Sequence, residues 1–567
     1  MTATLKRNLY DSYVRAFRWA TDRLPDEGVV AFVSNGGWIE DKAANGIRLV
    51  LAEEYARLYV LNLRGDQRGD WQLEGGKIFG EGAQTAVAIW IGVRSAKHVG
   101  PCEIFYHAIG DSLSREAKLA LLSRMTLDTI EWQRITPDSH GDWISQRSPG
   151  FVAWPAIGGK GSEGSIFCSY SLGLSTNRDK WVYNFSRNRL MGSVGRLVDN
   201  FNAEISPFHE FATANAVSNP TEKTVSAYLR KHPQSAASDY VKWTRKLRTR
   251  LTRQQRLSAN PECCRVGSYR PFTKQYVYFA ADLNEERSQL PKLFPTARHA
   301  NIAIVLTGPA SHFEFTPFIT DLMPNLHLLD SAQVFPRWTY EAIERDALDF
   351  VEDDPDEHGY RRADNISDHV LASYKKAIGD VATKDAIFYY VYGVLHDPSF
   401  RSEFAPELSK VLPHIRPPRG SEDFAGVSQI GRELADLHLN YEAAQPYPLQ
   451  VDIAPGTDLH SPETWRVERI QWLPKTDRSA IRYNKLITIS GVPQSAHSYV
   501  LGPRTALEWI FDRYRKDSDS ASGIVNDPND WCDEHDDPTY IVNLIKKITT
   551  VSVETAKLVE RLAEMPK

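Results

Sequence analysis

The sequence has few cysteines and no long apolar run. Its 567 residues include five cysteines, at positions 102, 168, 263, 264 and 532, and no two of them form a Cys-x-x-Cys pair. This scarcity favours a reduced, cytoplasmic protein without a structural zinc ion. Apolar runs such as 86–93 are far shorter than a bilayer span, and no signal-peptide pattern precedes residue 10. We therefore expect no membrane association.

Phosphate-binding and nuclease signatures are missing or out of context. No Gly-x4-Gly-Lys-Ser/Thr loop occurs, so we expect no ATPase motor in this chain. Gly159-x-Gly161-x-x-Gly164 matches the dinucleotide-binding pattern in form, but strand-like residues follow it where a helix is needed. A hairpin loop is the better interpretation. We also find no Asp…Asp/Glu-x-Lys set that would coordinate magnesium for DNA cleavage.

The overall composition is that of a globular protein, with 42% apolar and 25% charged residues. The length predicts three or four domains. Because the net charge is −5, any surface that binds nucleic acid must be a local patch.

The first 135 residues alternate between helix and strand patterns, which is typical of a doubly wound α/β sheet. The run 29–33 is apolar throughout and predicts a strand that is buried on both faces. Apolar spacing and length predict helices at 10–20 and 43–57 and strands at 29–33, 58–63 and 85–93.

Several sequence segments of this region resemble segments of a known class of enzymes. "GVVAFVSNGGWI", "IRLVLAEEY" and "KIFG" before a closing strand resemble the second half of an amino-group DNA methyltransferase domain. "LYDSYVRAFRWATDRL" and "LRGDQR…EGGKIFG" resemble, more narrowly, the type ISP restriction–modification enzymes. These are single-chain DNA translocases with a methyltransferase and a target recognition domain at the C-terminal end. The resemblance extends from about residue 8 to about residue 560.

The resemblance implies roles for Phe79 and for S-adenosylmethionine. In such methyltransferases the aromatic side chain that matches Phe79 stacks on the flipped target base, because the amino group cannot be reached inside a duplex. From residue type alone, Phe79 could equally be a buried anchor of its turn. The Gly-rich cofactor loop and the Asn/Asp-Pro-Pro-Tyr loop of the family lie upstream of this region. No Pro-Pro-Tyr occurs here, since the one Pro-Pro pair is followed by Arg419.

We therefore predict that this chain alone binds no S-adenosylmethionine and transfers no methyl group. The cofactor would belong to a complete enzyme, in which an upstream methyltransferase, helicase and nuclease polypeptide is the missing partner.

The stretch "SDYVKWTRKLRTRLTRQQRL", residues 238–257, predicts a helix with one apolar stripe. No acidic residue occurs between Asp239 and Glu262, so the cations of this stretch lack a local counter-charge. They favour the phosphate backbone of double-stranded DNA as partner, and the alternative is a solvated basic helix. These cations are Lys242, Arg245, Lys246, Arg248, Arg250, Arg253 and Arg256.

Two further segments recur in the target recognition domains of the resembling enzymes, "LSTNRDKWVYNF" at 174–185 and "YRPFTKQYVYF" at 269–279. The polar residues of the first are predicted to form a tip between strands, from which Arg can read guanine and Asn can read adenine. The alternating aromatics at 181, 183 and 185 are expected in the core. The candidate DNA contacts of the two segments are Asn177, Arg178, Asp179, Tyr269 and Arg270.

The remaining patterns complete the domain organisation. Residues 361–445 read as helical, with Thr383 as a helix cap, and the acidic stretch 350–362 reads as a linker. His396 and His438 lack metal-type spacing and are expected in the core or as caps. Cys532 and His535 form half of a zinc pattern, and 526–537 is interpreted as a turn-rich acidic loop.

The fold class predicted from these patterns is α/β. A partial Rossmann-like methyltransferase sheet is followed by an α+β target recognition domain with a helical middle module. The predicted domains are 1–135, 145–350, 361–445 and 450–567.

Two functions remain open. The first is sequence-specific DNA recognition in a phage-defence restriction–modification system, as the C-terminal portion of an adenine-N6 DNA methyltransferase. The second is a stand-alone DNA-binding specificity fragment or gene remnant without catalysis.

Overall fold

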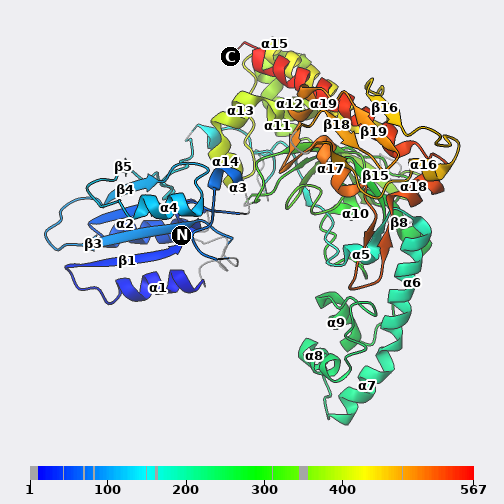
Figure 1. Ribbon diagram of the computed structural model, residues 1–567, viewed down its shortest axis with the longest axis horizontal. Helices are drawn as coiled ribbons and strands as arrows, with labels where there is room; N and C mark the ends of the chain where they lie inside the picture. Colours follow the sequence, from blue (N-terminus) through cyan, green and yellow to red (C-terminus); the bar gives the residue numbers. More distant parts are fainter. Residues whose placement is uncertain are drawn as a thin grey trace, which may run out of the picture. The chain divides into compact units, whose positions relative to one another are not determined.

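The structure is a computed structural model, and its described residues are 11–41, 44–67, 71–80, 84–148, 150–159, 164–309, 311–343, 355–474 and 477–566. The chain is mixed α/β, with several small sheets and many helices (Figure 1). It forms two compact units where the sequence predicted four domains. The N-terminal unit comprises Met1–Ala153, Pro309–Glu314 and Phe404–Pro413, and the C-terminal unit comprises Trp154–Gly308, Phe315–Glu403 and His414–Lys567.

The N-terminal unit contains a five-stranded sheet of order β1-β3-β2-β4-β5. Strand β3 is antiparallel to both β1 and β2, β2 is parallel to β4, and β4 is antiparallel to β5. The strands are β1 Gly28–Asn35, β2 Arg57–Asn62, β3 Val87–Arg94, β4 Glu103–Ala108 and β5 Gln133–Ile135. The helices are α1 Ser12–Thr21, α2 Asn45–Glu54, α3 Trp71–Glu74 and α4 Arg115–Leu122.

Strand β1 differs from its prediction as a strand buried on both faces. It is an edge strand whose exposure alternates along the chain. Val29 is 62% exposed and Val33 is 55% exposed. The alternate residues Val30 and Phe32 pack against the aromatic core of the unit. An unbroken apolar run predicts burial on two faces, but within the described structure only one face of β1 is covered.

Aromatic rings and buried ion pairs stabilise this unit. The rings of Phe17 and Trp90 lie 4.9 Å apart. Arg48 is fully buried and donates to Asp142 at 2.9 Å and to the carbonyl oxygens of Gly141 and Trp38. Removing Asp142 would leave Arg48 buried without its counter-charge, which typically costs about 3–5 kcal/mol. Asp142 itself also pairs with Arg147 at 2.8 Å and with Lys410 at 3.2 Å.

The C-terminal unit contains three four-stranded sheets, of orders β11-β10-β13-β6, β12-β8-β9-β7 and β16-β19-β18-β17. The strands of the first are β6 Ser171–Leu172, β10 Ala303–Leu306, β11 Pro317–Thr320 and β13 Gln333–Pro336. Those of the second are β7 Tyr183–Asn184, β8 Cys264–Arg270, β9 Thr273–Tyr278 and β12 Met323–Pro324. Those of the third are β16 Gln450–Ile453, β17 Gln471–Trp472, β18 Ala480–Arg482 and β19 Ile487–Ser490.

The unit also contains three separate two-stranded sheets: β14 Trp338–Ala342 with β15 Tyr360–Asp364, β20 Val500–Leu501 with β21 Arg504–Thr505, and β22 Asp517–Ser518 with β23 Val525–Asn526. Strand β15 pairs with β14 across the predicted boundary between 350 and 361. Residues 350–354 of the predicted linker lie outside the described residues, as do 160–163 of the Gly-rich loop.

A helical arm is inserted between β7 and β8, which lie in the same sheet (Figure 1). Ser186 caps its first helix by accepting a hydrogen bond from the backbone N–H of Arg189. The arm projects from the sheets of its unit, as the cyan-green helices of Figure 1 show. Its helices are α6 Arg187–Ala203, α7 Ile205–Ala214, α8 Glu222–Lys231 and α9 Arg245–Thr252.

Residues 361–445 are largely helical, but 404–413 of this predicted module belong to the N-terminal unit. Two helices of the segment approach closely at glycines. A Cβ at Gly431 would lie 2.0 Å from the carbonyl oxygen of Tyr389, and one at Gly393 would lie 2.6 Å from that of Val427. Thr383 caps α12, as predicted, by accepting from the Ala386 N–H. The helices are α11 Asp368–Ile378, α12 Lys384–His396, α13 Pro398–Glu403, α15 Ser421–Leu439 and the C-terminal α19 Tyr540–Glu564, while α14 Ala405–Lys410 belongs to the N-terminal unit.

The segment 526–537, interpreted above as a loop, forms helix α18, Pro528–Glu534. Asp527 accepts a hydrogen bond from the Asn529 N–H, and Pro528 opens the helix, where its missing N–H costs nothing. Cys532 is buried, and its thiol donates to the Pro528 carbonyl at 3.8 Å. The other short helices of this unit are α5 Asp179–Val182, α10 Leu290–Leu293, α16 Pro462–Trp465 and α17 Ala506–Arg513.

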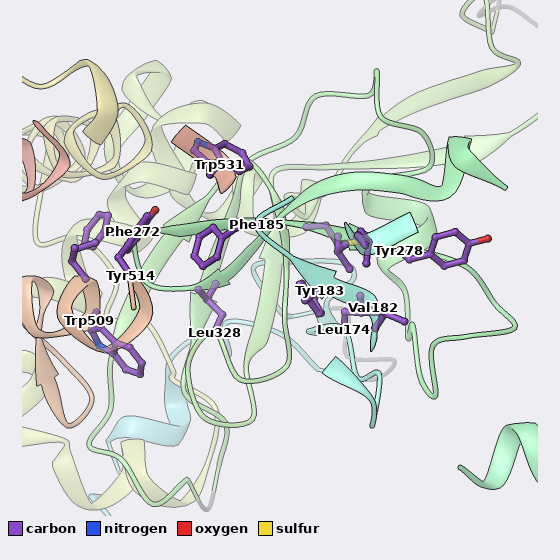
Figure 2. Packing of buried hydrophobic residues seen from close by; sticks show 14 of the residues in the cluster. Leu174, Val182, Tyr183, Phe185, Phe272, Tyr278, Leu328, Trp509, Tyr514 and Trp531 are labelled. Carbon is purple, nitrogen blue, oxygen red and sulfur yellow. The ribbon is translucent and has the colours of Figure 1, made fainter. Parts of the chain in front are cut away.

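One hydrophobic core joins the first and last parts of the C-terminal unit (Figure 2). Phe185, which follows β7, lies 5.4 Å from the ring of Tyr514 at the end of α17. Trp531 of α18 lies 5.2 Å from the ring of Tyr276 of β9. The predicted domains 145–350 and 450–567 therefore share one core. Trp181, Tyr183 and Phe185 are buried, as predicted.

Candidate nucleic-acid interface

The basic stretch 238–257 is helical only in α9, so the predicted helix is too long. The chain before α9 is held in turns by contacts that are distant in the sequence. The indole N–H of Trp243 donates to the Ser235 carbonyl at 2.7 Å, and the side chain of Asn200 donates to the Tyr240 carbonyl at 2.8 Å. These bonds fix two residues of the expected apolar stripe outside a helix.

Part of the positive charge of α9 is balanced by carboxylates from other elements, which corrects the expectation of unpaired cations. Arg245 lies 3.4 Å from Glu222 of α8, and Arg250 lies 2.6 Å from Asp282. Lys246 donates to the carbonyl oxygens of Ala281 and Asn284 at 3.0 and 2.7 Å. Five cations have no carboxylate partner within the described part of the chain: Lys242, Lys246, Arg248, Arg253 and Arg256.

Two hollows flank α9. A cleft of about 1040 Å³ lies on the α8 side and is lined by Lys223, Arg230, Lys242 and Arg248, with Glu222 as its carboxylate. A groove of about 350 Å³ is lined by other cations of the same helix, among them Arg253, with Asp282 and Glu285 as its carboxylates. Positive charge in concave surfaces concentrates the local potential that attracts a polyanion.

The recognition loop, residues 174–181, lines a pocket of about 340 Å³ together with Ser238 and Lys242 of the arm. Within this loop Asn177 is exposed and has a left-handed backbone with φ of 53°, a conformation that Asn tolerates better than most residues. Asp179 begins α5 and accepts a hydrogen bond from the Thr176 hydroxyl.

Arg178 does not project as a polar tip, which corrects its prediction. Its side chain is 3% exposed, and its guanidinium donates to the hydroxyl of Thr244, the residue before α9. Burial lowers the pKa of Arg178 to about 10, and the nearby carboxylate of Glu285 opposes this shift. The guanidinium remains charged at neutral pH, but Nε and Nη1 have no hydrogen-bond partner among the described residues. In this position the side chain cannot reach a base edge.

Tyr269 and Arg270 of β8 are half-buried, and Arg270 is linked to the recognition loop through Asn325. The Arg270 guanidinium lies 4.2 Å from the centre of the Tyr269 ring and donates to Asn325 at 3.1 Å. Asn325 in turn donates to Asp179 at 3.4 Å. Burial lowers the pKa of Arg270. The two recurring segments are therefore brought together through one amide side chain.

The sequence matches the model of one protein family. The type ISP C-terminal specificity domain matches residues 165–544, which contain the recognition loop, the arm and the third sheet. The chain belongs to the type ISP restriction–modification family.

Three solved structures are similar to this chain over its whole length. A nuclease-deletion mutant of the type ISP enzyme LlaGI, in complex with a DNA substrate mimic, is 35% identical with a TM-score of 0.83, and the match covers 100% of this chain and 49% of that one. The type ISP enzyme LlaBIII bound to DNA is 32% identical with a TM-score of 0.82, covering 100% and 34%. The DrdV–DNA complex is 29% identical with a TM-score of 0.79, covering 100% and 53%.

This chain thus spans about half or less of the length of these enzymes. No curated protein matches it.

Phe79 of the N-terminal unit is 53% exposed, whereas its neighbour Ile78 is buried. The Arg115 side chain donates to the Ile78 carbonyl at 3.0 Å and holds the turn. The interpretation of Phe79 as a buried anchor is therefore wrong, and Ile78 has that place. An exposed aromatic on a loop before β3 is available to stack on a base.

Histidines and cysteines form no metal site in the part of the chain that the structure describes. His396 and His438 are buried in the helical module, as predicted. His438 bonds to the Tyr392 hydroxyl at 2.7 Å and to the Thr555 hydroxyl at 2.9 Å. The five cysteines are free thiols. None of the described helices is both long and apolar enough to cross a membrane.

Sequence reasoning did not single out Thr244 and Asn325, which organise the interface. Thr244 carried a usable signal, because Thr directly before a helix is a common cap. Its hydroxyl accepts from Arg178, and no cap bond from it to α9 forms. Asn325 carried no local signal, because its partners Asp179 and Arg270 are 146 and 55 residues away.

Proposed function

We propose that this type ISP chain recognises a DNA sequence within a restriction–modification enzyme. The observation that carries the proposal is the specificity-domain match over 165–544, whose limits enclose both the cations of α9 and the exposed Asn177. The similar structures of LlaGI, LlaBIII and DrdV were each determined with DNA or a DNA mimic. The free thiols fit a reducing cytoplasm.

The arm and the recognition loop would contribute differently. Lys242, Arg248 and Arg253 would contact phosphates, which give affinity without sequence information. Asn177 would read a base edge, because its amide can bond bidentately to adenine. Arg178 would position these groups by linking the recognition loop to the residue before α9.

We propose the N-terminal unit as the distal part of an adenine-N6 methyltransferase domain with a Rossmann-like sheet. Strands β1 and β2 run in the same direction, since both are antiparallel to β3, and α2 lies between them in the sequence. This βαβ order is typical of such sheets. The exposed Phe79 would stack on the flipped base.

The residues of this chain do not fit a complete methyl-transfer site. No Pro-Pro-Tyr sequence is present to hold a target amino group. S-adenosylmethionine and the catalytic loop would come from the further methyltransferase, helicase and nuclease parts of a complete enzyme. This absence keeps a second function in view, a DNA-binding specificity fragment without catalysis. Both functions share the recognition step and differ only in whether added upstream parts restore methylation.

Duplex binding tests the proposal directly. The purified chain should bind a fluorescent 30-base-pair duplex, and log Kd should rise linearly with log salt concentration, with about one ion released per phosphate contact. Unlabelled duplex should compete, and an uncharged polymer of equal mass should not. Failure to bind any duplex at low salt would exclude the proposal.

A further inference from the structure

The C-terminal sheet module contains a second basic hollow that neither the sequence prediction nor the proposed interface uses. This C-terminal basic cleft has a volume of about 700 Å³ and lies among α16, the β18–β19 turn and the residues before α18. Its cations are Arg466, Arg469, Arg482, Lys485 and Lys516. All but Arg466 are exposed, and Arg466 is half-buried.

The lining of the cleft contains more cations than carboxylates. Among its carboxylates, Glu463 pairs with Arg466 at 2.8 Å, and Asp527 lies 3.6 Å from Lys516. Arg466 also pairs with Asp533 at 3.0 Å. That leaves three cations, Arg469, Arg482 and Lys485, without a carboxylate partner in the described structure, against the single remaining carboxylate of Glu468. Mutual repulsion of these cations favours an anionic ligand.

The walls of the cleft are fixed by two asparagines. Asn484 donates to the carbonyl oxygens of Thr464 and Arg466 at 2.9 and 3.0 Å. Asn529 accepts from the Val467 N–H and donates to the Val467 carbonyl, both at 2.8 Å. Tightly bonded walls hold the cations close to one another before any ligand arrives, which lowers the entropy cost of binding.

The cleft and the recognition-loop pocket are separate hollows that are lined by opposite ends of one short hairpin. Lys516 and Asp527, at the open end of the β22–β23 hairpin, line the cleft. Asp519 and Ser522, at its tip, line the recognition-loop pocket with Lys242. Three residues of extended chain span about 10 Å. A duplex carries one phosphate charge per about 1.7 Å of its axis, so one duplex is long enough to contact both hollows.

We propose that the C-terminal basic cleft binds the sugar–phosphate backbone of the duplex that the recognition loop reads. This inference rests on the proposed function and adds to it a second anchoring site. Arg469, Arg482 and Lys485 supply the phosphate contacts. The site fixes the direction in which the duplex leaves the recognition loop, because a second anchor beside the loop defines an axis for the duplex.

The test compares two variants that each lose three positive charges. In the cleft variant Arg469, Arg482 and Lys485 are changed to Gln, and in the matched control Lys292, Arg298 and Lys376, which are exposed elsewhere in the C-terminal unit, are changed to Gln. Circular dichroism and thermal unfolding should match the wild-type chain in both, because all six side chains lie on the surface.

Duplex affinity is then measured from 50 to 200 mM salt by fluorescence anisotropy. We expect the slope of log Kd against log salt to fall by about two to three units in the cleft variant, since each lost phosphate contact removes about one. The control should keep the wild-type slope. Equal slopes in the cleft variant, the control and the wild-type chain would overturn the cleft proposal alone. Absence of duplex binding by the wild-type chain would overturn the proposed function as well.

Discussion

The guanidinium of Arg178 donates a hydrogen bond to the hydroxyl of Thr244, 66 residues further along the chain. Arg178 directly precedes α5, and Thr244 directly precedes α9. This bond joins the recognition loop to the basic helix α9, through the residues that directly precede α5 and α9. The two surfaces that the sequence presents as separate candidates therefore form one interface.

Replacing Arg178 should loosen this connection without unfolding the protein. Arg178→Ala removes one hydrogen bond, worth about 1 kcal/mol, and also removes a buried cation with two unsatisfied donors. The lost hydrogen bond lowers stability and the removal of the buried cation raises it, so the free energy of unfolding should change by less than about 2 kcal/mol. Affinity for cognate and scrambled duplexes should fall by the same factor, because α9 is displaced and base readout is not. A selective loss for the cognate duplex would instead assign Arg178 to base readout.

Asn177 should carry discrimination between sequences. Asn177→Gly keeps a residue that accepts the left-handed backbone and removes only the amide side chain. A bidentate base contact is worth about 1–3 kcal/mol, so the ratio of cognate to scrambled affinity should fall about 5- to 150-fold, with an unchanged salt slope. If that ratio is retained, the readout lies in other residues of the specificity domain.

The cations of α9 should act on all duplexes alike. Arg253 and Arg256 are exposed and have no carboxylate partner in the described ranges, so their change to Gln should not disturb the fold. The salt slope should fall by about one unit per lost contact. Arg245 is a useful comparison, since it already lies 3.4 Å from Glu222 and Arg245→Gln should have less effect. Wild-type behaviour of the Arg253/Arg256 variant would indicate a solvated face.

The buried histidines should make the C-terminal unit less stable in mild acid. Burial lowers the pKa of His396 to about 4, whereas an unfolded chain has about 6.5. The unfolded state therefore binds more protons, and stability is lost as the pH falls from about 6.5 toward 4. At pH 5 the loss from His396 is about 2 kcal/mol. Burial, together with the neighbouring His396, also lowers the pKa of His438.

Urea unfolding at pH 7.5 and pH 5.0 measures this loss. In His396→Phe, which cannot titrate at this position, the difference between the two pH values should shrink by about 2 kcal/mol. The backbone carbonyl of Tyr392, which accepts from His396 Nδ1, retains its helical partner in this variant. The same pH difference in both proteins would show that His396 is not the titrating group.

Phe79 should affect activity without affecting stability. Because its side chain is 53% exposed, Phe79→Ala should change the free energy of unfolding by less than about 0.5 kcal/mol. In an enzyme completed with upstream methyltransferase parts, methylation should weaken by the loss of base stacking, about 1–3 kcal/mol. Phe79→Trp should preserve much of the activity. Full methylation by Phe79→Ala would remove Phe79 from the site.

Local patterns predicted much of the fold, because helices, strands and caps depend on neighbouring residues. The helix before β1, the strands β2 and β3, and the cap Thr383 follow from such patterns. The prediction of a turn-rich loop at 526–537 was wrong, although the sequence Asp527-Pro528 is typical of a helix start.

Long-range contacts account for the other differences. No local pattern shows that Trp243 bonds to Ser235, that Glu222 and Asp282 neutralise part of α9, or that β1 has an uncovered face. The burial of Arg178 could not be predicted from the sequence either, because three consecutive polar residues in a turn-like segment predict exposure. The C-terminal basic cleft was missed because its cations come from three separate segments, 466–469, 482–485 and 516.

Sequence selection tests the central claim most directly. The purified chain is incubated at 150 mM salt with a pool of 40-base-pair duplexes that contain a randomised centre, and bound DNA is recovered, amplified and sequenced over several rounds. Our account predicts that one short motif is enriched, and that a duplex with this motif binds more tightly than its scrambled version. Binding without any enriched motif, or no recovered DNA, would contradict a role in sequence-specific recognition.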